Sequence, residues 1–487
     1  MYEDILNLEP KRIWKYFTEI LQVPRPSKQE EKIAEYILAF GKERDLETLR
    51  DKVGNILIRK TATTGYENRK SVCLQSHIDM VCEKNADIPF DFSKDPIDAY
   101  VDGDWIKARG TTLGADDGIG IAAQLAILDA DDIEHGPIEC LFTVDEETGL
   151  TGAFGLEPGF LKSDILLNLD SEDEGQLFIG CAGGKDTVIE IPFLKEEMLT
   201  DQASFIIKVS GLKGGHSGDD IEKGLANANK ILNRILWNAA NDYQLRLRTF
   251  KGGNLRNAIA REAEALVVVP RDHGKELVDF VNAFAKDAKA EYKITEPGMK
   301  IDISPADMPA WLVDKTTQKN LLNSVYACPH GVMAWSREIP DFVETSTNLA
   351  SVKMKDNSFE ITTSQRSSVE SAKKDIADMV AATFRLTGAK ITQGHGYPGW
   401  TPNPNSEIVS ITEKSYKELF KEDPEVLAVH AGLECGLIGD KYPGMDMISY
   451  GPEIKGAHSP DEKLQITSTK RFWELTLDVL KRIPEAG

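Results

Sequence analysis

Several features are scarce in this chain, and each scarcity argues against a kind of protein. The 487 residues include only six cysteines, no two of them in CxxC spacing, which disfavours a zinc site built on sulfur and indicates a reducing compartment. No run of about 18 uncharged apolar residues occurs, so no membrane span is predicted. The N-terminus lacks the basic and apolar regions of a signal peptide, and a cytoplasmic location is expected.

Basic residues are also in deficit. Lys plus Arg number 57 and Asp plus Glu number 79, which gives a formal net charge of −22. This balance argues against nucleic acid, whose phosphates need a basic face, and against a basic membrane-surface helix. It suits solubility, or a site that gathers cations. We therefore expect neither nucleic acid nor membrane among the partners.

The order of the apolar runs predicts an α/β fold. Short strand patterns at 72–75, 138–144 and 165–169 alternate with a helix pattern at 118–128. This alternation is typical of a mixed, mostly parallel sheet covered by helices. Nearer the N-terminus, Ser27 and Glu30 have the spacing of a capping box for a helix that runs to Phe40.

The middle of the chain changes character and predicts an inserted α+β domain. Strand and helix patterns recur there in β-rich surroundings, including a strand at 205–209, a Gly-rich turn and a helix at 221–237. A Gly/Pro-rich segment at 394–400 marks the return to the first domain. The expected ranges are 1–184 for the first part of the catalytic domain, 185–388 for the inserted domain and 389–487 for the second part.

Potential metal ligands follow three of the predicted strands. In open α/β sheets, sites form at the carboxyl ends of strands, so side chains at these positions are expected to converge. Two further candidates lie in loops, one at a turn that opens a helix and one near the C-terminus. The candidates are His77 with Asp79, Asp116, Glu146 with Glu147, Asp170 and His458.

Imidazoles and carboxylates without a thiolate favour zinc, cobalt or manganese. Five ligand candidates exceed what one tetrahedral ion with an open position requires, whereas two ions about 3.5–4 Å apart can share a carboxylate. Asp79 lies two residues past His77, on the same side of an extended segment, where it can accept the other imidazole proton. Two adjacent glutamates allow one to bind metal while the other acts as a general base.

Each candidate also has an ordinary interpretation when it is taken alone. Asp116 and Asp117 could face the dipole of the helix that follows them, and Glu146 and Glu147 could be solvated surface. The turn after Asp170 and the loop around His458 could simply be exposed. The joint pattern, with each candidate after an apolar strand or in a loop, favours a dinuclear metal site.

Taken together, three segments carry a family resemblance: 76–80 (SHIDM), 112–118 (TLGADDG) and 145–149 (DEETG). They resemble the co-catalytic dinuclear zinc metallopeptidases of the aminoacylase and carboxypeptidase G type, and the resemblance covers essentially the whole chain. It implies a zinc-exopeptidase-type catalytic domain with an inserted lid domain through which the chain forms a homodimer. Two divalent ions per subunit are implied as cofactors.

The resemblance also implies a role for each metal-site residue. Asp116 bridges the two ions, His77 and Asp170 complete one of them, and Glu147 and His458 complete the other. Asp79 orients His77. Glu146 is the general base that activates the bridging water.

Four residues of the inserted domain match shorter motifs of the family. His216 is implied to stabilise the oxyanion, and in related dimers this histidine reaches the partner subunit's site. Asn257, Arg366 and Gly432 are implied to contact substrate, with Arg366 taking the terminal carboxylate. From the residues alone, His216 could belong to a tight hairpin and Arg366 to the surface. The remaining histidines, His430 among them, are given structural roles.

The function implied by the resemblance is metal-dependent hydrolysis of small peptides. Dipeptides of the Xaa-His type, including β-alanyl-histidine, are the expected substrates within a broad range. Two alternatives stay open: an N-acyl amino acid amidohydrolase with the same metals, and a non-catalytic protein that binds metal or peptide. The presence of Glu146 disfavours the second, because a pure binder needs no general base.

Overall fold

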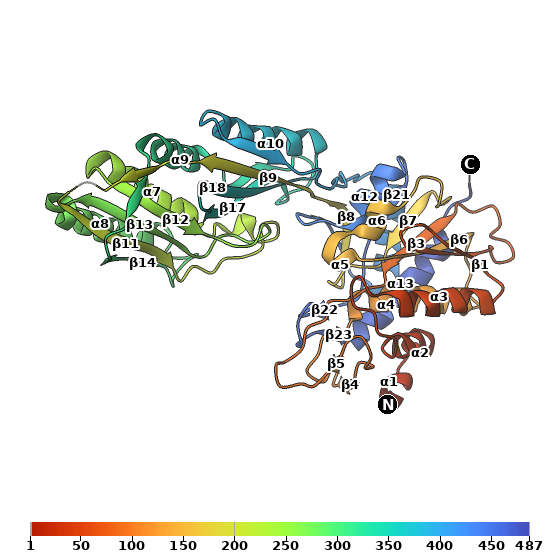
Figure 1. Cartoon of the computed structure of the whole chain (residues 1–487). Helices are drawn as coiled ribbons and strands as arrows, with labels where there is room; N and C mark the ends of the chain where they lie inside the picture. Colours follow the sequence, from red (N-terminus) through yellow and green to blue (C-terminus); the bar gives the residue numbers. More distant parts are fainter. Residues whose placement is uncertain (1, 199, 487) are drawn as a thin grey trace. The chain divides into compact units, whose positions relative to one another are not determined.

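We describe the chain from a computed structural model, which covers residues 2–198 and 200–486. It divides into two compact units (Figure 1). The first unit comprises residues 2–181, 400–428 and 433–486, and the second comprises Ala182–Gly399 and Val429–Gly432. The return to the first unit therefore falls at Trp400, in the Gly/Pro-rich segment, with a short excursion of four residues at 429–432.

The first unit is built on an eight-stranded mixed sheet. Its centre is parallel, because β3 pairs in parallel with both β6 and β7, and β21 pairs in parallel with β7. Strands β1 and β2, at one side of the sheet, pair antiparallel. In spatial order the strands are β1 (Glu47–Arg50), β2 (Ile56–Lys60), β6 (Ile138–Thr143), β3 (Val72–His77), β7 (Ile165–Asn168), β21 (Asp446–Ser449), β8 (Gln176–Cys181) and β20 (Glu425–Val429).

The central strands form because helices cover them, which buries every residue of β3, β6 and β7. Helix α4 packs on β3, and α2 packs on α4. The helices of this unit are α1 (Glu3–Leu6), α2 (Lys11–Ile20), α3 (Glu31–Glu43), α4 (Ala115–Asp129), α5 (Glu146–Gly149), α6 (Thr151–Gly155), α11 (Glu407–Phe420), α12 (Glu434–Lys441) and α13 (Ile466–Arg482). A small sheet joins β22 (Ile454–Lys455), β23 (Lys463–Gln465), β5 (Trp105–Ala108) and β4 (Ala99–Asp102).

The predicted capping box before α3 is wrong. The helix begins after Glu30, and no side chain caps it. The Ser27 hydroxyl donates instead to Asp79 Oδ2 over 2.8 Å, because a buried carboxylate is the stronger acceptor. A residue with the sequence signature of a helix cap thus belongs to the site described below.

The second unit is built on a nine-stranded antiparallel sheet. Its two halves, one of four strands and one of five, meet where β12 pairs with β17 at Gly252 and Val352. In order, the strands are β14 (Lys300–Pro305), β11 (Gln202–Ser210), β13 (Ala263–Pro270), β12 (Arg246–Gly252), β17 (Val343–Met354), β18 (Ser358–Ser367), β9 (Gly183–Pro192) and β19 (Lys390–Gln393), while β16 (Gly331–Trp335) also pairs with β17. A separate pair joins β10 (Lys195–Glu197) to β15 (Trp311–Val313).

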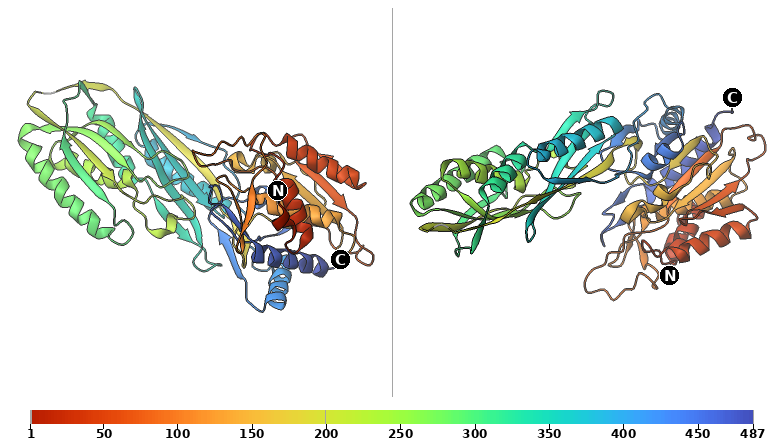
Figure 2. Two further views of the ribbon diagram at one scale, coloured as in Figure 1. Left: turned by 90° about the horizontal axis from the view of Figure 1, so that it is seen from below. Right: turned by 45° about the horizontal axis from the view of Figure 1, so that its top comes forward.

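Four helices gather on one face of this sheet (Figure 2). They are α7 (Ala228–Asp242), α8 (Gly274–Glu291), α9 (Lys315–Ala327) and α10 (Glu370–Arg385), with short 3₁₀ turns η1 (Ile221–Lys223) and η2 (Arg271–His273). The helix predicted at 221–237 starts later, at Ala228. Gly224 has a φ of 65°, which interrupts the pattern, and the Asn227 side chain caps the new start by accepting from the Asn229 and Lys230 amides.

Among the helices that the structure describes, none is both long and apolar enough to cross a membrane.

Candidate metal centre

The predicted ligands lie at the carboxyl end of the parallel strands of the first unit. His77 is the last residue of β3, Asp170 follows β7, and Glu146 and Glu147 open α5 just after β6. Asp116 sits in the first turn of α4 without capping it, since the cap position is Gly114 and no side chain caps the helix there. His458 lies in the loop between β22 and β23.

The side chains form two ligand groups that share Asp116. The ligand atoms of His77, Asp116 and Asp170 lie within 4.8 Å of one another, and those of Asp116, Glu147 and His458 do so as well. His77 Nε2 is 3.0 Å from Asp116 Oδ1, and His458 Nε2 is 3.1 Å from Asp116 Oδ2. Each oxygen of this carboxylate therefore faces one imidazole.

The donor set fits divalent cations. Glu147 Oε1 is buried and finds no hydrogen-bond donor among the described residues. A buried carboxylate oxygen in that state carries a large desolvation cost unless a cation lies beside it. His77 Nε2, besides facing Asp116, is 3.3 Å from Asp170 Oδ1, and His458 Nε2 is 3.1 Å from Glu147 Oε2. These nitrogen and oxygen donors match the preferences of zinc, cobalt and manganese.

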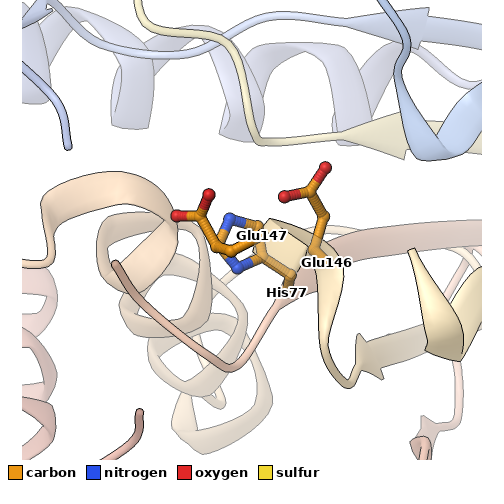
Figure 3. Close-up of side chains that lie close together, drawn as sticks. All are labelled: His77, Glu146 and Glu147. Carbon is orange, nitrogen blue, oxygen red and sulfur yellow. The ribbon is translucent and has the colours of Figure 1, made fainter. Parts of the chain in front are cut away.

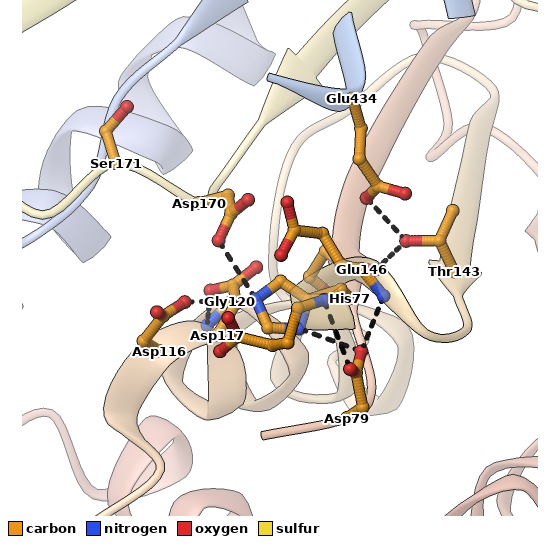
Figure 4. Close-up of polar contacts among 12 residues, drawn as sticks. His77, Asp79, Asp116, Asp117, Gly120, Thr143, Glu146, Asp170, Ser171 and Glu434 are labelled. Atoms are coloured by element: carbon orange, nitrogen blue, oxygen red, sulfur yellow. Dashed lines mark hydrogen bonds and ion pairs between the residues drawn. The ribbon is translucent and has the colours of Figure 1, made fainter. Parts of the chain in front are cut away.

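Asp79 holds His77 from behind and is fully buried. Its Oδ1 is 3.3 Å from His77 Nδ1, which leaves Nε2 directed at Asp116 and Asp170 (Figure 4). The carboxylate also accepts from the backbone amides of Glu146 and Glu147, over 3.0 and 3.3 Å. Burial alone would raise the pKa of Asp79, but these bonds and those from His77 and Ser27 lower it to about 2.

The crowding of carboxylates strongly shifts the pKa values of the other ionisable groups in the site. Hydrogen bonds to Asp116 and Glu147 raise the pKa of His458 to about 11. Burial would raise the pKa of Asp116, but His458 and His77 hold it well below its usual range. Burial raises the pKa of Asp170 to about 6. The site thus favours positive charge at the positions that face Asp116.

Glu146 stands beside the ligands. One of its oxygens, one of Glu147 and a nitrogen of His77 lie within 4.8 Å of one another (Figure 3). Burial raises the pKa of Glu146 well above its usual range. The two glutamates are therefore not solvated surface, and the side chain of Glu147 is only 5% exposed.

Two buried charged residues outside the predicted ligand set, Arg25 and Glu462, hold the backbone that presents the ligands. The Arg25 guanidinium donates to the carbonyls of Ile78, Asp79 and Gly114, which joins the strand end of β3 to the Asp116 turn. The Glu462 carboxylate accepts from the amides of residues 113–116, with three of the contacts at 2.7–2.9 Å. The proximity of Glu462 to His458 in the sequence was the only available signal.

The predicted residues of the inserted domain form a group of their own in the second unit. Arg366 Nη2 lies 3.3 Å from His216 Nε2, and Arg366 Nη1 donates to Tyr397 Oη over 3.0 Å. The Tyr397 ring packs against Gly432, where an added Cβ would come within 2.8 Å of Tyr397 Cε2. The Asn257 carbonyl accepts from the Ser217 amide, next to His216, over 2.7 Å.

Arg366 does not lie at the surface position that was its alternative, whereas Asn257 is exposed and His216 is partly exposed. Arg366 is 7% exposed. His216 and Asn257 line a cavity of about 850 Å³ over the ends of β11 and β12. His430 is buried, with its Nε2 2.7 Å from Ser346 Oγ, and burial lowers its pKa to about 3. The structural role expected for His430 stays a prediction.

The fold and this set of side chains define a peptidase. Residues 73–482 match the model of peptidase family M20/M25/M40, and the chain belongs to this family. It is 45% identical over 482 residues to the cytosol non-specific dipeptidase of Escherichia coli K12, a match that covers 99% of each chain.

Solved structures agree. The aminoacylhistidine dipeptidase of Vibrio alginolyticus is 43% identical, with a TM-score of 0.93 over 99% of each chain. A tripeptidase from Staphylococcus aureus, 17% identical with a TM-score of 0.58 over 98% of this chain and 99% of its own, shares the fold. The expected α/β fold and family are therefore confirmed.

We predict that Glu462→Ala destabilises the first unit. It leaves the amides of residues 113–115 buried without their acceptor, and one such group costs about 1–3 kcal/mol. Denaturant unfolding followed by tryptophan fluorescence measures the change. The matched control is the exposed neighbour Asp461→Ala, expected within about 0.5 kcal/mol of the parent. Equal unfolding curves for the two variants would contradict a stabilising role of Glu462.

Proposed function

We propose that this peptidase hydrolyses dipeptides, with Xaa-His dipeptides such as β-alanyl-histidine among a broad range of substrates. Two relatives that match nearly the whole chain support the substrate class, one named a non-specific dipeptidase and the other an aminoacylhistidine dipeptidase. Identity above 40% over such a length supports a shared reaction.

The observation that carries the catalytic part is the position of Asp116, whose two oxygens each face a histidine. We assign His77 and Asp170 to one divalent ion, Glu147 and His458 to a second, and Asp116 to both. Zinc is the first candidate, and cobalt and manganese suit the same donors. Divalent ions held there would supply Lewis-acid polarisation of a carbonyl and would lower the pKa of a bound water.

The residues of the chain handle the protons and the orientation. Glu146 takes the proton of the attacking water and passes it to the leaving amine, a transfer its position beside the ligands supports. Asp79 keeps the proton of His77 on Nδ1, so that Nε2 remains free to bind. In the second unit, we assign His216 to the oxyanion, Arg366 to the terminal carboxylate, and Asn257 and Gly432 to substrate contact.

Two further properties belong to the same proposal. We propose a homodimer formed through the inserted lid domain, in keeping with the family resemblance of the sequence. We also propose a cytoplasmic location, which the name of the E. coli relative, a cytosol dipeptidase, and the sparse cysteines support.

The proposal predicts that chelator-stripped protein is inactive and regains dipeptide hydrolysis when it is reloaded with zinc, cobalt or manganese. The test assays Ala-His, β-alanyl-histidine and N-acetyl amino acids side by side, one metal at a time. Faster turnover of the N-acetyl compounds would make the chain an amidohydrolase. Binding of metal without turnover of either class would make it a binding protein.

A second prediction concerns the base. Glu146→Gln lowers kcat by about 10²–10⁴-fold, because the amide cannot accept the proton of the water. Metal content, measured by plasma emission after dialysis, stays at the parent value. Glu35→Gln, an exposed glutamate of the same unit, is the control and keeps full activity. An active Glu146→Gln enzyme with full metal would refute the assignment.

A third prediction concerns the shared ligand. Asp116→Ala loses bound metal, since it removes a donor from both ligand groups at once. The measurement is the molar ratio of metal to chain after gel filtration in metal-free buffer. The exposed Asp131→Ala is the control. Unchanged metal content in Asp116→Ala would rule out the bridging role.

A further inference from the structure

A buried acid that neither the sequence patterns nor the proposed mechanism uses lies beside the metal centre. Glu434 is the first residue of α12, and it is fully buried. Its Oε2 accepts from Gln75 Nε2 and from Thr143 Oγ1, each over 2.6 Å. Its Oε1 is buried and has no hydrogen-bond partner among the described residues.

Glu434 is the end of a chain of buried hydrogen bonds. Gln75 Oε1 accepts from Asn168 Nδ2 over 2.6 Å, and Asn168 Oδ1 accepts from Ser449 Oγ over 2.5 Å. Ser449 Oγ in turn lies 2.6 Å from Ser171 Oγ. We call the six residues Glu434, Thr143, Gln75, Asn168, Ser449 and Ser171 the polar ladder.

The polar ladder crosses the parallel centre of the sheet. Thr143, Gln75, Asn168 and Ser449 belong to β6, β3, β7 and β21, which are consecutive neighbours in the sheet. All four of these side chains are inaccessible to solvent. The ladder therefore runs across the strands at the edge from which the metal ligands emerge.

Three residues of the polar ladder lie close in sequence to residues of the site. Gln75 is two residues before His77 within β3, so both side chains lie on the same side of that strand. Asn168 is the last residue of β7 and is two residues before Asp170. Thr143 is three residues before Glu146. Figure 4 shows Glu434 and Thr143 beside Glu146, with Asp170 and His77 next to them.

The ladder is not needed to align the strands. Backbone pairing already fixes the register of β3 against β6 and β7. Buried polar groups cost free energy unless they are fully paired, and Glu434 keeps one oxygen unpaired. Apolar side chains at these positions would serve the sheet as well, which favours a role in the site over a role in the fold.

We propose that Glu434 is a positioning residue of the metal centre: through the hydrogen bonds that it accepts from Thr143 and Gln75, it fixes the strand ends that carry Glu146, His77 and Asp170. Outer hydrogen-bond partners of this kind tune ligand orientation and metal affinity. The reaction that it serves rests on the proposed function, but its effect on the metal ligands does not.

The test measures zinc affinity by competition with a chromophoric chelator, together with kcat and KM. Glu434→Ala raises the dissociation constant of at least one zinc by about 10–100-fold. Glu434→Gln, which keeps an acceptor oxygen for Thr143 and Gln75, stays close to the parent. An affinity unchanged in Glu434→Ala, or lost equally in Glu434→Gln, overturns the proposal.

A second pair of variants keeps the test decisive if Glu434→Ala does not fold. Thr143→Val replaces with a methyl group the hydroxyl that donates to Glu434 and also contacts Gln75. It weakens zinc binding or lowers kcat, while Thr143→Ser restores both. Thr476→Val, a buried threonine of α13 outside the polar ladder, controls for general loss of stability. Equal zinc affinity and kcat for Thr143→Val and Thr476→Val overturns the proposal.

The double variant Glu434→Ala with Thr143→Val separates positioning from an unrelated loss of stability. Both changes remove the same hydrogen bond, so their effects on zinc affinity do not add. Fully additive effects contradict the shared bond. A parent enzyme that binds zinc but hydrolyses no dipeptide would refute the proposed function alone, because the zinc measurement still decides the role of Glu434.

Discussion

The constraint on which this structure depends is the burial of several carboxylates around too few cations. The carboxylates in question belong to Asp116, Glu147 and Asp170. Among the described residues, their ion-pair partners are two histidines, His77 and His458. Such charges cannot be desolvated without compensation. Binding of divalent ions would supply it, so that folding of the first unit and metal binding are coupled through the same side chains.

The fold meets this constraint with groups that are themselves buried. Arg25 binds carbonyl oxygens and Glu462 binds amides of the same turn, so each takes the end of the peptide dipole that suits its charge. Asp79 binds both His77 and the amides that begin α5. The ligands therefore sit on backbone segments fixed by ionic hydrogen bonds as well as by the sheet. A displacement of one turn would break several of these contacts together.

The sequence predicted the parts of the site whose signal is local. His77, Glu147 and Asp170 each follow a short apolar run, and Asp116 lies in a Gly-rich turn, so strand ends and acid types could be read together. Glu434 and Glu462 could not be found in this way. Glu462 meets a turn 349 positions earlier in the chain, and Glu434 meets Gln75 across 359 positions. No sequence spacing identifies either residue, because each meets its hydrogen-bond partners only in the folded chain.

Local rules also failed where a tertiary contact competed with them. Ser27 has the spacing of a helix cap, yet its hydroxyl binds Asp79, because the buried carboxylate gains more from the bond than the helix end does. The later start of α7 is a different case, since Gly224 and Asn227 were present in the sequence and favour a break and a cap. At this position the turn chemistry of Gly224 and Asn227 outweighs the hydrophobic period.

The contacts that His216 and Arg366 make in the second unit restrict the roles proposed for them. Asp219 contacts His216 Nδ1 twice, through its carboxylate Oδ2 at 2.8 Å and through its backbone amide, which donates over 3.3 Å. Arg366 directs its guanidinium at Nε2 of the same ring. In this arrangement Nε2 is an acceptor and cannot donate to an oxyanion. A protonated Nε2 would repel Arg366. A substrate carboxylate that takes up the guanidinium would remove this conflict, so occupation of Arg366 and activation of His216 would be linked events.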